Sequence, residues 1–126
     1  MTTRQPTVLY VEDNEYNRKI VRQLLSRTSY RLLEASDGEG ALALVREDRP
    51  DLVLMDVQLP RMSGLDATRA LRADPATADL PVIVVTSFAL SGDDQRAMAA
   101  GASAYLAKPY SPRDLLALIR KFLPES

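Results

Sequence analysis

Five polar residues of this chain stand at the ends of short, mainly apolar runs, where they could act together in one site. They are Glu12, Asp13, Asp56, Thr86 and Lys108. Runs of this length and composition are typical of strands that are buried on both faces in a parallel sheet. The carboxyl ends of parallel strands lie at one edge of the sheet, which is where open α/β sheets bind ligands. Residues almost a hundred positions apart are therefore expected to meet there.

The acidic members of this set indicate a metal site. If the first and third strands are neighbours, the carboxylates of Glu12, Asp13 and Asp56 lie within a few ångströms of one another. Two like charges ~4 Å apart repel by about 4 kcal/mol at an effective dielectric constant of about 20, so a proton or a cation must lie among them. The chain has no cysteine and no histidine, and oxygen ligands alone favour Mg²⁺. We expect Asp13, Asp56 and a loop carbonyl such as that of Gln58 to hold the ion, with Glu12 acting through water.

The same residues could carry out phosphoryl transfer. A divalent ion with few protein ligands keeps open positions that a phosphoryl oxygen can fill, and the reaction needs mainly charge neutralisation and positioning. Asp56 is the candidate nucleophile and would form an aspartyl phosphate. Lys108 would pair with a second phosphoryl oxygen, and the Thr86 hydroxyl would donate a hydrogen bond to the third. The phosphoryl group adds charge next to Thr86, so Thr86 and the loop after it would gain a new interaction partner. Such a change would let the site act as a switch.

Each of these residues also has an ordinary structural explanation. An aspartate that follows a strand is commonly a turn former or a helix cap, which would account for Asp13 or Asp56 taken alone. Thr86 could be a strand-end hydroxyl, Lys108 a solvated charge and Tyr105 a half-buried strand aromatic. The combination at the ends of neighbouring strands favours the functional interpretation.

The apolar runs and turn signals predict an α/β fold. Strands are expected over residues 7–11, 30–35, 52–55, 82–85 and 104–107. Their alternation with helical segments predicts a doubly wound, five-stranded parallel sheet in the order 2-1-3-4-5 with five helices, a flavodoxin-like topology. The second strand carries charged residues and suits an exposed edge of the sheet.

Capping residues mark where the helices should begin. Caps are expected at Ser63, Ser91 and Ser111, the first two helices are expected to begin near Asn14 and Asp37, and a glycine at position 101 is expected to end the fourth helix. The first helix carries apolar residues at helical spacing, which we expect to face the sheet. These residues are Tyr16, Ile20, Val21, Leu24 and Leu25.

Composition and charge restrict the class of protein. The 126 residues fit a single domain, 1–126, with a core over about 6–123 and no output domain. Sixteen basic and 17 acidic residues give a net charge of -1, so no overall field attracts nucleic acid or an anionic membrane. No apolar run approaches the ~20 residues of a membrane-spanning helix, and no signal peptide is recognisable, so we expect a cytoplasmic protein. The lack of histidine excludes Ser-His-Asp triads and histidine-based zinc sites.

The sequence resembles the receiver domain of two-component response regulators. The resemblance rests on Glu12-Asp13 after the first strand, on Asp56 in Leu-Met-Asp-Val-Gln-Leu-Pro-Arg-Met-Ser-Gly, on Thr86 after Val-Ile-Val-Val, and on Lys108-Pro. It covers about residues 6–123. The sequence around these residues is most similar to single-domain cell-division regulators and to receivers of hybrid histidine kinases. The ends of the chain favour a free-standing regulator.

This resemblance implies a role for each residue of the site. Asp56 would be the phosphoacceptor, and its phosphoryl group would come from a phosphohistidine on a histidine kinase or a histidine phosphotransfer protein. Asp13 would bind Mg²⁺ directly, with Glu12, where aspartate is commoner, as its acidic companion. Thr86 and Tyr105 would form the switch pair. The protein would be a phosphoacceptor signalling domain rather than an enzyme, with at most slow self-dephosphorylation.

The resemblance also implies which surfaces are used. The fourth helix, fifth strand and fifth helix would form the output face for a downstream protein, with Tyr110 and Arg113 nearby, and the first helix would help to dock the phosphodonor. The protein would be a monomer or a phosphorylation-dependent dimer. Lys108 would precede a cis proline, and Gln58, together with Ser87 and Phe88, would tune the lifetime of the acyl phosphate.

Other functions remain open on the sequence alone. A Mg²⁺-dependent phosphohydrolase also uses an aspartyl nucleophile, but it needs a second acid two residues later, where this chain has Gln58. A nucleotide or flavin carrier would need a phosphate-binding loop after the first strand, where Glu12 and Asp13 would repel phosphate. A receiver-like adaptor that is never phosphorylated would not need the intact set of site residues.

Overall fold

The computed structural model describes residues 5–86 and 93–125, and it alternates strands with helices along the chain. The strands are β1 (Thr7–Val11), β2 (Arg31–Ala35), β3 (Leu52–Asp56), β4 (Val82–Thr86) and β5 (Ala104–Ala107). The helices are α1 (Glu15–Leu25), α2 (Gly38–Asp48), α3 (Gly64–Ala73), α4 (Asp93–Ala99) and α5 (Pro112–Phe122). The strands are all parallel and form one sheet in the order β2-β1-β3-β4-β5, as the sequence predicted.

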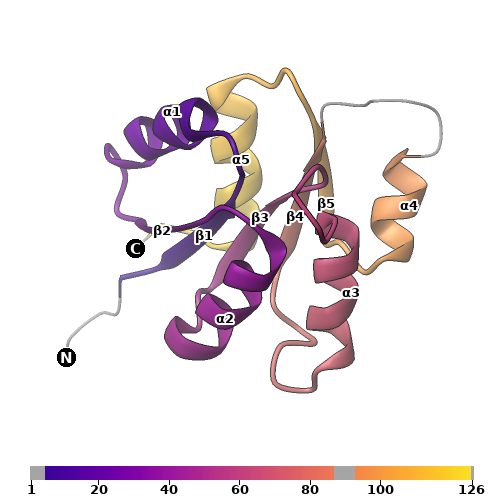
Figure 1. The fold of residues 1–126 in the computed structure, drawn as a ribbon. Helices are drawn as coiled ribbons and strands as arrows, with labels where there is room; N and C mark the ends of the chain where they lie inside the picture. The colour runs from indigo at the N-terminus through magenta and orange to yellow at the C-terminus, as the bar shows by residue number, and fades with distance from the viewer. Residues whose placement is uncertain (1–4, 87–92, 126) are drawn as a thin grey trace.

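The helices cover the sheet on both faces (Figure 1). Side chains alternate along a strand, so each strand contributes to two separate cores. On β1, Leu9 and Val11 pack with α2, α3 and α4, whereas Val8 and Tyr10 pack with α1 and α5. The central strands β1, β3 and β4 are buried along their whole length, which explains why their sequences are nearly continuous apolar runs.

Polar side chains cap four of the helices, and the sequence predicted the caps at Ser63 and Ser111. Each cap accepts a hydrogen bond from the backbone N–H three residues further on, and this satisfies one of the free donors in the first helical turn. The caps are Asn14, Asp37, Ser63 and Ser111. Gly101 follows α4 with a φ of 106°, a left-handed conformation that favours glycine. The predicted cap at Ser91 and the predicted tuning residues Ser87 and Phe88 lie outside the described residues.

The apolar face of α1 is narrower than the sequence predicted. Val21 and Leu25 are buried against the sheet, but Tyr16 is 70% exposed and Ile20 is 45% exposed. At 100° per residue, Tyr16 lies about 140° around the helix from Val21, so both cannot face the same layer. The expectation that the whole stripe contacts the sheet was therefore wrong for Tyr16 and Ile20.

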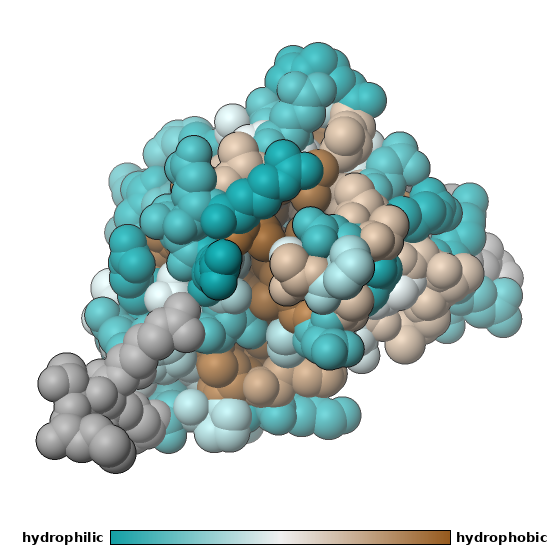
Figure 2. Space-filling view, turned by 90° about the horizontal axis from the view of Figure 1, so that it is seen from below, coloured by the Kyte–Doolittle hydropathy of each residue, from teal (hydrophilic) through white to brown (hydrophobic). Residues whose placement is uncertain are grey.

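The surface seen from below Figure 1 is mostly hydrophilic, with hydrophobic residues between the polar ones near its centre (Figure 2). Within the described residues, none of the helices is both long and apolar enough to cross a membrane. The peptide bond between Lys108 and Pro109 is cis, as expected.

Candidate functional site

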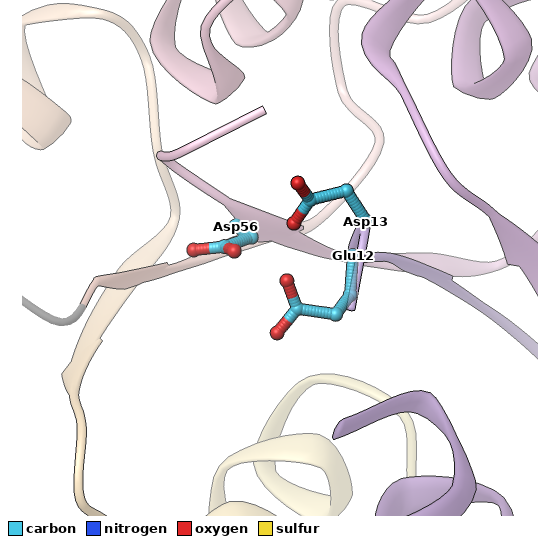
Figure 3. A group of neighbouring side chains, drawn as sticks. All are labelled: Glu12, Asp13 and Asp56. Atoms are coloured by element: carbon cyan, nitrogen blue, oxygen red, sulfur yellow. The ribbon is translucent and has the colours of Figure 1, made fainter. Parts of the chain in front are cut away.

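The adjacency of β1 and β3 brings three carboxylates together at the carboxyl edge of the sheet. Val11 pairs with Met55, so the residues that follow, Glu12 and Asp56, lie side by side. One carboxylate oxygen from each of Glu12, Asp13 and Asp56 lies within 4.8 Å of the others. Figure 3 shows the carboxyl groups of Glu12 and Asp13 extending from the end of β1 toward Asp56. The sequence predicted this cluster.

The three carboxylates differ in their exposure to solvent. Glu12 and Asp56 are only 1% and 3% exposed, whereas Asp13 is exposed. Asp13 therefore lies at the entrance and Asp56 just inside it. All three offer hard oxygen ligands and two are already desolvated, so this donor set fits a divalent cation such as Mg²⁺.

Lys108 supplies a positive charge next to the cluster. Its Nζ lies 2.8 Å from Glu12 Oε1 and 3.6 Å from Asp56 Oδ2. The pairing of β4 with β5 brings it there, because Lys108 directly follows β5 and its backbone N–H donates to the Thr86 carbonyl at 2.7 Å. The sequence predicted Lys108 at this edge but did not indicate that Glu12, rather than Asp56, is its nearer partner.

Burial and charge shift the pKa values of the carboxyl groups in opposite directions. Burial, together with a hydrogen bond to Glu12 and its charge, raises the pKa of Asp56 to about 7. Burial also disfavours the ionised form of Glu12, but hydrogen bonds from Asp56 and Lys108 outweigh it and hold the Glu12 pKa below its usual range. Without a metal ion, a proton on Asp56 is therefore shared with an ionised Glu12.

Two further residues contact Glu12, and the sequence did not single them out for the site. Asn17 Nδ2 donates to Glu12 Oε1 at 2.9 Å from the first turn of α1. The Tyr10 hydroxyl, which is buried in β1, approaches the same oxygen at 3.4 Å. Position was the available signal, because Tyr10 is two residues before Glu12 on the same side of the strand and Asn17 is three residues after the Asn14 cap.

The remaining predicted site residues lie around this cluster. Asp56 pairs with Val85, so Thr86 is one residue beyond it on β4, and it is buried. Tyr105 lies on β5 and packs with the core under α2, α3 and α4. The backbone N–H of Gln58 is 3.5 Å from Asp56 Oδ1, a weak contact, and the role of its carbonyl as a metal ligand stays a prediction.

A groove of about 640 Å³ borders the site on the side of α1 and α5. Apolar residues form most of its lining, including Ile20, Leu24 and Tyr110. Asn17 and Lys108 also line it, so the groove and the carboxylate cluster share a wall.

The strand order, the two helical layers and the acidic edge define the flavodoxin-like class of α/β proteins in which receivers are found. A sequence profile of the response regulator receiver domain matches residues 8–120, and the chain therefore belongs to this family. It is a response regulator receiver domain of two-component signalling. Domains of this family interact with histidine kinases and with downstream targets.

The curated relatives agree with this assignment. The chain is 42% identical over 120 residues to the polar-differentiation response regulators DivK of Brucella anthropi and Brucella ovis. The alignment covers 95% of this chain and 98% of each relative. These comparisons give no support to the phosphohydrolase alternative.

Solved structures show the same fold. The receiver domain of a sensor histidine kinase from Pseudomonas aeruginosa, with a magnesium ion coordinated in its active-site cleft, is 34% identical with a TM-score of 0.86. That alignment covers 94% of this chain and 98% of the other. A chemotaxis protein CheY4 of Vibrio cholerae is 30% identical with a TM-score of 0.88, covering 95% of this chain and 100% of the other.

Proposed function

We propose that this receiver accepts a phosphoryl group on Asp56 from a phosphohistidine of a histidine kinase or a histidine phosphotransfer protein. The observation that carries the proposal is the convergence of Glu12, Asp13 and Asp56, with Lys108 Nζ 2.8 Å from one carboxylate and 3.6 Å from another. A nucleophile, metal-binding groups and a cation thus lie together at one edge of the sheet, which is what in-line phosphoryl transfer needs.

In the reaction, a carboxylate oxygen of Asp56 attacks the phosphorus of the donor. The new O–P bond forms as the N–P bond to the imidazole breaks, and the imidazole nitrogen keeps the electron pair and takes a proton from solvent. Asp13, Asp56 and the Gln58 carbonyl would hold Mg²⁺, with Glu12 reached through water. The bound cation would neutralise charge on the phosphoryl oxygens and favour the ionised, nucleophilic form of Asp56.

Lys108 and Thr86 would then contact the transferred group. Lys108 needs to move only from Glu12 toward the phosphoryl oxygens at Asp56, because it is already 3.6 Å from Asp56 Oδ2. The Thr86 hydroxyl would donate a hydrogen bond to another oxygen, and Tyr105 on the adjacent strand would respond to its movement. The surface of α4, β5 and α5 would change with them and control the binding of a downstream protein.

The phosphodonor would dock over α1 and the adjoining groove. Ile20 is 45% exposed on α1 and also lines the groove. An apolar groove of this kind accepts the apolar face of a partner helix, and it would bring the phosphohistidine to the entrance at Asp13.

We propose that the protein is a cytoplasmic signalling domain whose only turnover activity is slow self-dephosphorylation. It would be a monomer or would dimerise on phosphorylation, and it would make no direct contact with nucleic acid.

Acetyl phosphate with Mg²⁺ tests the assignment of Asp56. Mass spectrometry should find one added phosphoryl group on the wild type and none on Asp56→Asn, whereas Asp66→Asn, an exposed aspartate on α3, should react as the wild type does. Addition that persists in Asp56→Asn would overturn the proposal. Rapid turnover of a small phosphoester would instead favour the phosphohydrolase.

A further inference from the structure

We propose that Asn17 is a positioning residue that holds the Glu12 carboxylate in place when Lys108 leaves it for the phosphoryl group. The inference rests on the proposed phosphorylation of Asp56 and adds a residue that acts through Glu12. Asn17 is a neutral side chain on α1, and the sequence analysis assigned it no role.

Three donors converge on a single oxygen in this structure. Glu12 Oε1 lies 2.8 Å from Lys108 Nζ, 2.9 Å from Asn17 Nδ2 and 3.4 Å from the Tyr10 hydroxyl. A carboxylate oxygen has two lone-pair directions, so the two short contacts already satisfy it. The Tyr10 contact is too long to replace either of them. Asn17 is therefore the closer of the two donors to Glu12 Oε1 whose side chains carry neither a full charge nor a carboxyl proton.

Glu12 cannot adapt by turning toward water. It is 1% exposed, its backbone N–H donates to the Ala35 carbonyl at 3.0 Å, and its own carbonyl accepts from Arg18 Nη1 at 3.0 Å. An ionised carboxylate in such a place needs compensating donors, because burial without them is costly. In the resting state Lys108 supplies the positive charge in that compensation, beside the hydrogen bonds from Asp56 and Asn17.

Phosphorylation changes this balance. Lys108 would move from Glu12 Oε1 to a phosphoryl oxygen, so Glu12 would lose the cation that contacts it directly while it stays buried. The Asn17 amide would remain within hydrogen-bond distance because the first turn of α1 fixes it, where its backbone N–H donates to the Asn14 cap at 3.0 Å. The hydrogen bond from Asn17 would therefore stabilise Glu12 more after Lys108 has moved than before. An interaction that is stronger in the transition state than in the resting state speeds a reaction.

The variant Asn17→Ala isolates this effect. Alanine favours the helix and the side chain is only half-buried, so Asn17→Ala should fold as the wild type does, with a melting temperature only slightly lower because one hydrogen bond to Glu12 is lost. The maximal rate of phosphorylation by acetyl phosphate should fall about ten-fold, the factor that one hydrogen bond to a charged group represents. The Mg²⁺ concentration for half-maximal binding to the unmodified protein, measured by NMR titration, should not change, because Lys108 still compensates Glu12 in that state.

Two controls separate positioning from a general structural effect. Asn17→Gln keeps the amide donor on a longer side chain and should recover part of the rate, and Lys19→Ala, an exposed change on the same helix, should have no effect. Beryllium fluoride, a tetrahedral substitute for the phosphoryl group, should bind Asn17→Ala about ten-fold more weakly than it binds the wild type.

A double-variant cycle with Lys108→Met gives the decisive test. If Asn17 acts only when Lys108 leaves Glu12, then adding Asn17→Ala to Lys108→Met should cost no further rate. The inference about Asn17 would be overturned if the rate losses of the two variants add, or if Asn17→Ala is phosphorylated at the wild-type rate. In both cases the wild type is phosphorylated, so the proposed function would stand. A wild type that takes up no phosphoryl group would instead overturn the proposed function.

Discussion

At the scale of single residues, the raised pKa of Asp56 has a consequence for stability. A pKa that rises from 3.8 to about 7 on folding means that the native state holds a proton which the unfolded chain releases. The contribution of protonated Asp56 is complete below about pH 4 and is lost as the pH rises through about 7. In Mg²⁺-free buffer, Asp56→Asn should therefore be more stable than the wild type by up to about 4 kcal/mol at about pH 8, and equal to it near pH 4.

Urea unfolding across this pH range measures the difference. Adding Mg²⁺ at the higher pH should narrow it, because a bound cation favours the ionised wild-type carboxylate. Equal stabilities of the two proteins at every pH would contradict the buried, crowded Asp56 described here.

Sequence reasoning found the charged residues of the site because each one ends a recognisable strand. It could not find the contacts between them. The pairing of Lys108 with Glu12 and the amide of Asn17 on the same oxygen depend on side-chain conformations and on where α1 lies over the sheet. Neither follows from residue type or spacing.

At the scale of elements, the start of α3 fixes the loop that follows Asp56. A Cβ at Gly64 would lie 1.9 Å from the Asp56 carbonyl oxygen, a backbone atom that cannot give way. Gly64→Ala should therefore destabilise the protein by roughly 3 kcal/mol, the upper range for overpacking. Gly38→Ala is the matched control at the start of α2, since its Cβ would meet only the flexible Met62 side chain at 2.9 Å.

Chemical denaturation of both glycine variants compares these effects. Gly38→Ala should stay within about 1 kcal/mol of the wild type, because the higher helix propensity of alanine offsets a small clash. A loss for Gly38→Ala as large as that for Gly64→Ala would contradict a specific role for the turn at Gly64. The sequence indicated a tight turn here, but the approach of Gly64 to the Asp56 carbonyl appears only in the folded chain.

The elements themselves were predictable because capping and strand signals agree with one another along the chain. The exposure of part of the apolar stripe on α1 was not predictable in this way. Helical periodicity identifies an apolar stripe, but only the packed structure shows how much of that stripe the sheet and α5 can cover. Of the two uncovered residues, Tyr16 and Ile20, Ile20 lines the groove on the proposed input side.

At the scale of the whole molecule, the large hydrophobic side chains that remain exposed among the described residues lie on opposite sides of the sheet. Tyr16 and Ile20 are on α1, and Met98 is on α4 (Figure 1). The carboxylate cluster lies at the edge between these two layers. Under the proposed function, the phosphodonor would dock on the α1 side, whereas Met98 lies on the α4 part of the output face, so these two positions can be tested separately.

Ile20→Asp should weaken docking of the phosphodonor, because it places a charge on the apolar edge of the groove. The measurement is a ratio of two rates: transfer from a phosphorylated histidine phosphotransfer protein, divided by phosphorylation with acetyl phosphate. We expect this ratio to fall at least about ten-fold, as it does when an interface loses an important contact. Met98→Asp makes the same chemical change on the other side of the sheet and should leave that ratio as it is in the wild type. If this ratio of transfer rates is the same for Ile20→Asp as for Met98→Asp, the donor does not dock over α1. If the ratio falls for Met98→Asp alone, docking lies on the α4 side.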